Sequence, residues 1–130
     1  KNIMSGSIDP DTNTMKVALV TSAYTPNQDT HEDMADVTNE ITGTGYTAGG
    51  ATIGSSVVSA DTTDNEGVWD GADVTWSTAT ITARGAVIYK STGTPANDLL
   101  VCYLDFSTDQ SSSGADFTIA WNAEGILNLA

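Results

Sequence analysis

The chain has 130 residues, which fits a single domain (residues 1–130) that can bury a core without a metal or a disulfide. Its formal net charge is −13, and such a surface repels phosphate backbones, which argues against nucleic acid as a partner. The single cysteine excludes an internal disulfide, and no apolar run approaches the roughly 20 residues of a membrane helix.

The amino-terminal part predicts a short arm followed by a strand. Residues 1–13 form the arm, which could anchor the chain or contact a partner. Residues 14–22, TMKVALVTS, place Met15, Val17 and Leu19 on one face with a period of two, which is typical of a strand. A long polar connection follows, in which HEDMADV offers one helical turn at most.

Two acidic stretches have features of calcium sites. DPDTN at 9–13 opens like a calcium loop, but Thr14 and Val20 stand where such a loop needs glycine and a bidentate glutamate, so we interpret it as a turn. A less regular calcium site could be formed by a second set of carboxylates: Asp61, Asp64 and Glu66. Nothing in their spacing requires an ion, and we expect no metal and no cofactor.

The segment 43–53, GTGYTAGGATI, is rich in glycine. Glycine loops that bind phosphate precede a helix and usually carry a lysine, whereas this segment has no basic residue and leads into a β-rich ATI. We therefore expect its glycines to adopt positive φ between strands, with Tyr46 packed across the turn. The loop also supplies our candidate residues for contacts between subunits: Gly43, Gly45, Tyr46, Gly49 and Gly50.

The remainder reads as further strands separated by turns. Residues 51–60 predict a strand with a bulge at Gly54, 61–67 a polar hairpin turn, and 78–90 a long strand that bends at Gly85. In between, VWDGADVTW offers an Asp-Gly pair for a tight reversal. Almost no segment favours a helix.

The last third predicts the interior of the sheet. Residues 98–106, DLLVCYLDF, are apolar on both faces, so we expect a central strand with Cys102 buried. DFTIAW and ILNL predict the last two strands. Seven or eight strands argue for an all-β fold, an antiparallel β-sandwich or a barrel-like sheet. The expected core is Met15, Val17, Leu19, Val87, Tyr89, Phe117, Ile119 and Trp121.

Catalytic patterns are weak. His31 is the single histidine and lies among acidic residues, without the G-x-S-x-G motif of a serine hydrolase or the H-E-x-x-H motif of a zinc protease. We interpret it as a solvated loop residue and expect that the chain is not an enzyme.

Three stretches taken together carry a resemblance: residues 14–53 with KVAL and GTGYTAGG, 72–93 with a V-x-Y strand, and 99–129 ending in DFTIAW and GILNL. In this order they resemble a family of small virion structural proteins of tailed bacteriophages. The resemblance implies a β-rich, non-enzymatic part of the particle, assembled in the host cytoplasm. A head-decoration (cement) role, in contact with copies of itself and with a major capsid protein, and a tail or adaptor role would both fit.

Two other classes stay open. A carbohydrate-binding β-sandwich would use exposed tryptophans as a sugar platform, and the candidates are Trp69, Trp76 and Trp121. A subunit of an extracellular filament would show unpaired strand edges.

Overall fold

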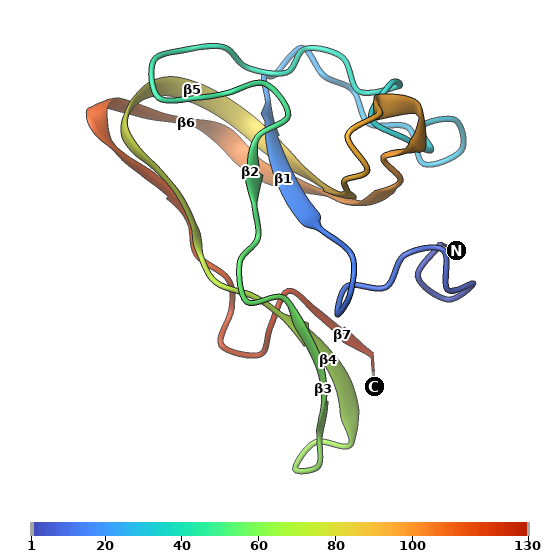
Figure 1. Cartoon of the computed structure of the whole chain (residues 1–130). Helices are drawn as coiled ribbons and strands as arrows, with labels where there is room; N and C mark the ends of the chain where they lie inside the picture. The colour runs from blue at the N-terminus through green and yellow to red at the C-terminus, as the bar shows by residue number, and fades with distance from the viewer. Residues whose placement is uncertain (1, 130) are drawn as a thin grey trace.

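The chain is described by a computed structural model that covers residues 2–129 and forms two antiparallel sheets (Figure 1). The larger sheet has the order β2-β1-β5-β6, with the bounds Ala51–Thr52, Met15–Val20, Val74–Lys90 and Leu100–Ile119. The smaller has the order β3-β4-β7, with the bounds Val57–Asp61, Glu66–Asp70 and Leu127–Leu129. A 3-10 turn, η1, spans Pro95–Asn97. The predicted all-β, sandwich-like fold is confirmed.

The long strand β5 organises the larger sheet. Its carboxyl half pairs with all of β1, from Val20 opposite Gly85 to Met15 opposite Lys90. Along most of its length it also pairs with β6, and the register of that pair shifts at four places. Because each bulge bends a strand and increases its twist, β5 and β6 form the curved ribbon seen in Figure 1.

The main core lies between the two sheets and draws on both. Alternate residues of β1 meet Trp69 of β4 and Trp76 of β5 in one cluster. A second, smaller cluster of Val20, Tyr24 and Val87 lies on the opposite face of the larger sheet, because successive residues of a strand point to opposite faces. Seven of the eight predicted core residues are buried, and the exception, Trp121, is only partly buried beyond the end of β6.

The prediction that residues 98–106 form a central strand with a buried cysteine is wrong. The segment opens β6, which is an edge strand, and Cys102 is exposed. Its apolar pattern has another cause. Val101 and Leu104 pack on the main core, while Leu100 and Tyr103 pack on the second cluster. An edge strand that is covered on both faces thus has the same pattern as a central one.

Two predicted local features are instead crossings between the sheets. Gly54 does not mark a bulge in one strand, since β2 and β3 belong to different sheets. The Asp-Gly pair does not reverse the chain, because β4 and β5 do not pair with each other. The crossings lie side by side: the Ala72 amide donates to the Gly54 carbonyl at 2.7 Å. A Cβ atom on Gly71 would lie 2.5 Å from the buried Ile53 side chain, so glycine is required there.

Candidate subunit-contact surface

The glycine–tyrosine loop, residues 43–50, is packed tightly against the larger sheet. The Thr44 carbonyl accepts a hydrogen bond of 2.9 Å from the Thr80 amide of β5. A Cβ atom on Gly43 would lie 2.5 Å from the Thr80 carbonyl oxygen, and one on Gly50 would overlap the Val17 carbonyl. Gly50 also has a φ of 65°, which L side chains rarely adopt. These glycines are therefore explained by close approach to the chain's own backbone.

A hydrogen-bond network centred on Glu40 holds this loop in place. One Glu40 carboxylate oxygen accepts from the Tyr46 hydroxyl and from the Gly49 amide, each at 2.6 Å. The Tyr46 hydroxyl accepts in turn from the Leu19 amide at 2.9 Å. The Tyr89 hydroxyl donates to the Gly49 carbonyl at 2.6 Å. The network thus gives the Leu19 amide a hydrogen-bond partner on the edge of β1, at a point that the two-residue strand β2 does not reach.

Burial raises the pKa of both tyrosines in this network. The pKa of Tyr46 is well above its ordinary value, because burial and its hydrogen bond to Glu40 both favour the neutral phenol. The pKa of Tyr89 is raised to about 12 by burial and by the negative charges of Asp98 and Glu40. The loop is thus a structural part of the subunit, and its role in contacts between subunits stays a prediction.

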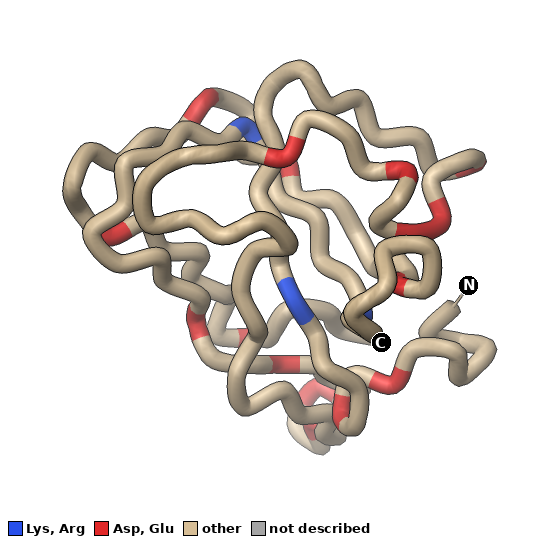
Figure 2. The backbone as a smooth tube through the Cα atoms, turned by 45° about the horizontal axis from the view of Figure 1, so that its top comes forward, with Lys and Arg blue, Asp and Glu red and all other residues tan. Residues whose placement is uncertain are grey.

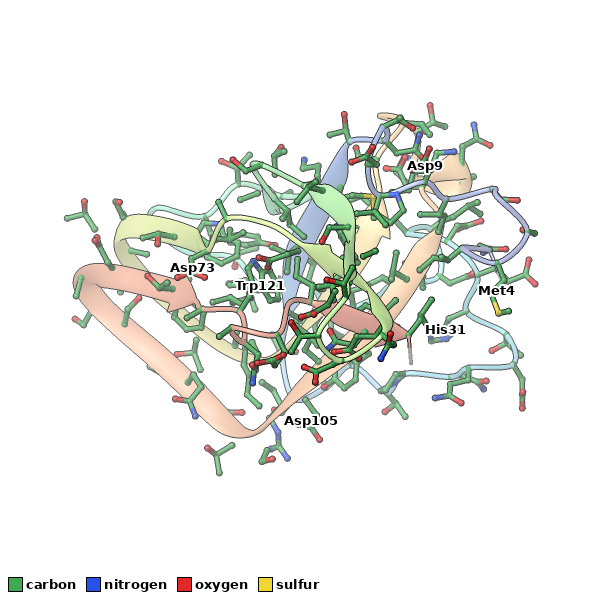
Figure 3. The ribbon with its side chains drawn as sticks, turned by 90° about the horizontal axis from the view of Figure 1, so that it is seen from below. Met4, Asp9, His31, Asp73, Asp105 and Trp121 are labelled. Carbon is green, nitrogen blue, oxygen red and sulfur yellow. The ribbon has the colours of Figure 1, made fainter. Side chains whose placement is uncertain are left out.

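The arm predicted at residues 1–13 is partly attached to the body. Ile8 is buried in the main core, and the Ser56 hydroxyl donates to the Pro10 carbonyl at 2.6 Å. Asp9 accepts hydrogen bonds within the following turn, as expected of DPDTN. The exposed tip of the arm is Met4, which is 89% exposed and lies at the periphery in Figure 3.

The smaller sheet carries an apolar strip on the face that continues from the core. Val58 lies opposite Trp69, and Trp69 lies opposite Leu127, so the three share a face. One row further out, Leu129 lies opposite Gly67 on the same face. Trp69 is 3% exposed, whereas Val58 is 47% and Leu129 is 59% exposed. The larger sheet therefore leaves the outer part of the strip uncovered. This part lies where the β3–β4 hairpin projects from the body (Figure 1).

An acidic cluster lies beside the β3–β4 turn. Carboxylate oxygens of Asp61, Asp64 and Glu124 lie within 4.8 Å of one another, next to a hollow of about 380 Å³. Hydrogen bonds from the Thr63 and Asp64 amides lower the pKa of Asp61. Of the three carboxylates that the sequence suggested, Asp61 and Asp64 lie together, and Glu124 takes the place of Glu66. The three oxygens have the chemistry of a calcium ligand set.

The candidate residues for catalysis and for sugar binding have structural partners or are buried. His31 Nδ1 lies 3.0 Å from the Tyr24 hydroxyl rather than beside a serine. Trp69 and Trp76, at 3% and 5% exposed, are too buried to stack on a sugar. Trp121, labelled in Figure 3, is partly exposed, but its indole donates to the Ala72 carbonyl at 2.9 Å.

A scan against protein-family models, a search of curated proteins and a search of solved structures each found no match to this chain. In residues 2–129 no helix has both the length and the apolar character that crossing a membrane demands.

Proposed function

We propose that this chain is a non-enzymatic structural subunit of a tailed-phage virion that binds the capsid shell as a decoration, or cement, protein. The ordered motifs of the sequence support this proposal through their resemblance to small phage virion proteins. The fold is all-β, and Trp69 and Trp76 lie in its core. Such a fold is compatible with a structural protein that acts by contact with other proteins.

The observation that carries the proposal is the apolar strip of the smaller sheet. Val58 of the projecting β3–β4 hairpin and Leu129 of β7, which pairs with β4, leave hydrophobic side chains in water. Burying such side chains at an interface contributes about 25 cal/mol for each Å² removed from water. A projecting strip of this kind suits insertion against a capsid protein or a second copy.

The charge distribution favours contact through this strip. Acidic residues are spread over the molecule with few cations among them (Figure 2). Copies at −13 repel one another over a Debye length of about 10 Å at 0.1 M salt. An interface between copies must therefore use uncharged surface. The residues of the apolar strip carry no charge.

Reconstitution tests the proposal. Capsids of a phage that encodes this chain, prepared without it, are incubated with the purified protein, pelleted and imaged by electron cryomicroscopy. We expect a fixed number of copies per capsid and density on the shell. Absence of co-pelleting would refute the decoration role, and density at the tail or its connector would assign the tail or adaptor role instead.

Neighbouring valines provide a matched control. Val57 and Val58 are 46% and 47% exposed and point to opposite faces of β3. We expect Val58→Lys to abolish capsid binding and Val57→Lys to preserve it. Equal binding by the two variants would show that the strip is not the contact.

Within residues 2–129 the outer edge of β6 has no strand partner, although the Leu100 amide at its start donates to the Glu32 carbonyl at 3.0 Å. This edge favours a second candidate, a filament subunit whose copies join by adding strands. Two features oppose such pairing. The register shifts with β5 interrupt the ladder, and Asp105, Asp109 and Asp116 place negative charge along the strand. Bulges and charges are devices by which edge strands avoid pairing. Fibres of purified protein in electron micrographs would support the filament over the capsid role.

A further inference from the structure

A cleft of about 670 Å³ lies beside the second cluster, away from the apolar strip. One wall is the loop that contains Tyr24, His31 and Glu32, and the floor is formed by the paired ends of β5 and β6. The amino-terminal segment, through Ile3, closes one end. This volume falls within the range of about 300–1,000 Å³ that is typical of ligand clefts.

Three aromatic rings line the cleft and are held in place. The centroids of Tyr24 and Tyr103 are 5.8 Å apart in an edge-to-face arrangement, and those of Tyr24 and His31 are 5.7 Å apart. The Tyr103 ring lies across β5, where a Cβ atom on Gly85 would come within 2.5 Å of its hydroxyl. Glycine at this position therefore sets where the Tyr103 ring lies.

The charge that residues 2–129 place around the cleft is negative. Among the described residues, none donates a hydrogen bond to the Glu32 carboxylate, which lines the cleft. The Asp36 carboxylate lies close by, accepting from the Glu32 amide at 2.9 Å, and its charge contributes to the raised pKa of Tyr24, after burial and Tyr103. The cation near Tyr103 is Arg84, which is paired with Asp105 at 3.4 Å.

We propose that this cleft receives an arginine or lysine side chain from a basic segment of a partner protein. The apolar stem of the side chain would lie along the half-buried Leu100, as such stems do on apolar surface. Its cationic head would meet the half-buried Tyr103 ring by cation–π attraction and the Glu32 carboxylate by a charge-assisted hydrogen bond, while the buried Tyr24 ring holds Tyr103 in place. Arginine fits better than lysine because its planar guanidinium stacks on aromatic rings. The proposal goes beyond the capsid role and does not depend on it.

The test is an NMR titration of the ¹⁵N-labelled full chain with N-acetyl-arginine amide. The neutral isostere N-acetyl-citrulline amide serves as the matched control probe. We expect saturable shifts at Tyr24, His31, Cys102 and Tyr103, and binding of the citrulline compound at least about tenfold weaker. That factor corresponds to the loss of one interaction of about 1.4 kcal/mol.

Substitutions then separate the cleft from the general acidity of the surface. Glu32→Gln should weaken arginine-amide binding several-fold, because it removes the charge without removing a side-chain hydrogen bond of the fold. Tyr103→Leu should weaken it similarly, and Tyr103→Phe should not. Asp64→Asn makes the same charge change as Glu32→Gln but lies on the hairpin turn of the other sheet, so it should leave binding unaltered.

Three results would overturn the proposal. Equal binding of the citrulline compound would show an apolar cleft without charge recognition. Equal weakening by Asp64→Asn and Glu32→Gln would show diffuse attraction to the acidic surface. Shifts as large at residues 61–66 as at the cleft would show the same. Because Glu32→Gln leaves the packing untouched, it decides the matter even where Tyr103→Leu disturbs folding.

Discussion

The Tyr46 hydroxyl donates a hydrogen bond of 2.6 Å to the Glu40 carboxylate, across six residues of chain. The same hydroxyl accepts from the Leu19 amide of β1 at 2.9 Å. One phenol thus joins a loop carboxylate to the amide of Leu19, whose carbonyl accepts separately from the Ile41 amide at 3.0 Å. Four expectations about stability follow from this and related contacts.

Tyr46→Phe should destabilise the fold by about 1–3 kcal/mol, because it leaves both the Leu19 amide and the Glu40 carboxylate without their shared partner. Tyr103→Phe removes a hydroxyl from a more exposed ring and should cost less than about 0.5 kcal/mol. Urea unfolding of the two variants and the parent measures the difference. Equal effects would mean that water readily replaces the Tyr46 hydroxyl.

Stability should fall at alkaline pH partly through Tyr89. Its pKa is about 12 in the folded chain against an ordinary value of 10.0, so the folded state holds this proton more tightly. The resulting stabilisation is complete below pH 10 and is lost as the pH rises from 10 to about 12. Tyr89→Phe cannot titrate, so the advantage of the parent over this variant should shrink across that interval. Unfolding free energies at several pH values test this, and a constant difference would contradict it.

Gly50→Ala should cost on the order of 3 kcal/mol or more, since its φ is positive and a Cβ atom would overlap the Val17 carbonyl. Gly67→Ala is the control, because a Cβ atom there meets nothing within 4 Å. We expect the control to stay within about 0.5 kcal/mol of the parent. Thermal or urea unfolding suffices, and a tolerated Gly50→Ala would mean that the loop can move away from β1.

Trp76→Ala should cost about 3–5 kcal/mol, because its ring is buried between Tyr46 and Phe117. Trp121→Ala should lower the free energy of unfolding by less, since its ring is only partly buried and its indole donates one hydrogen bond, to the Ala72 carbonyl. Denaturant unfolding of both variants provides the comparison. A larger loss for Trp121 would show that the crossing segment around Ala72 depends on it.

Local patterns in the sequence were sufficient for several elements. The alternation of Met15, Val17 and Leu19 predicted β1 and the face that it buries, because successive side chains of a strand point to opposite faces. The polar residues at 61–67 predicted the β3–β4 turn, and ILNL predicted β7. Each of these rests on neighbours in the chain.

The partners of polar side chains could not be predicted in the same way. No motif links Glu40 to Tyr46 and Gly49, or brings Glu124 beside Asp61, because these contacts depend on where loops come to lie. Nor does any local signal place Tyr103 over Gly85.

The sequence by itself determined that the chain would form strands and most of the residues that avoid water, with Cys102 and Trp121 as exceptions, since both follow from backbone preference and from side chains two residues apart. The tertiary structure decided which strand lies at an edge and where the chain changes sheets. The apolar pattern of residues 98–106 requires cover on both faces, and that cover comes from two separate clusters rather than from a neighbouring strand on each side. Burial depends on what lies above and below a strand, whereas its place in the sheet depends on backbone hydrogen bonds, which every residue except proline can form alike.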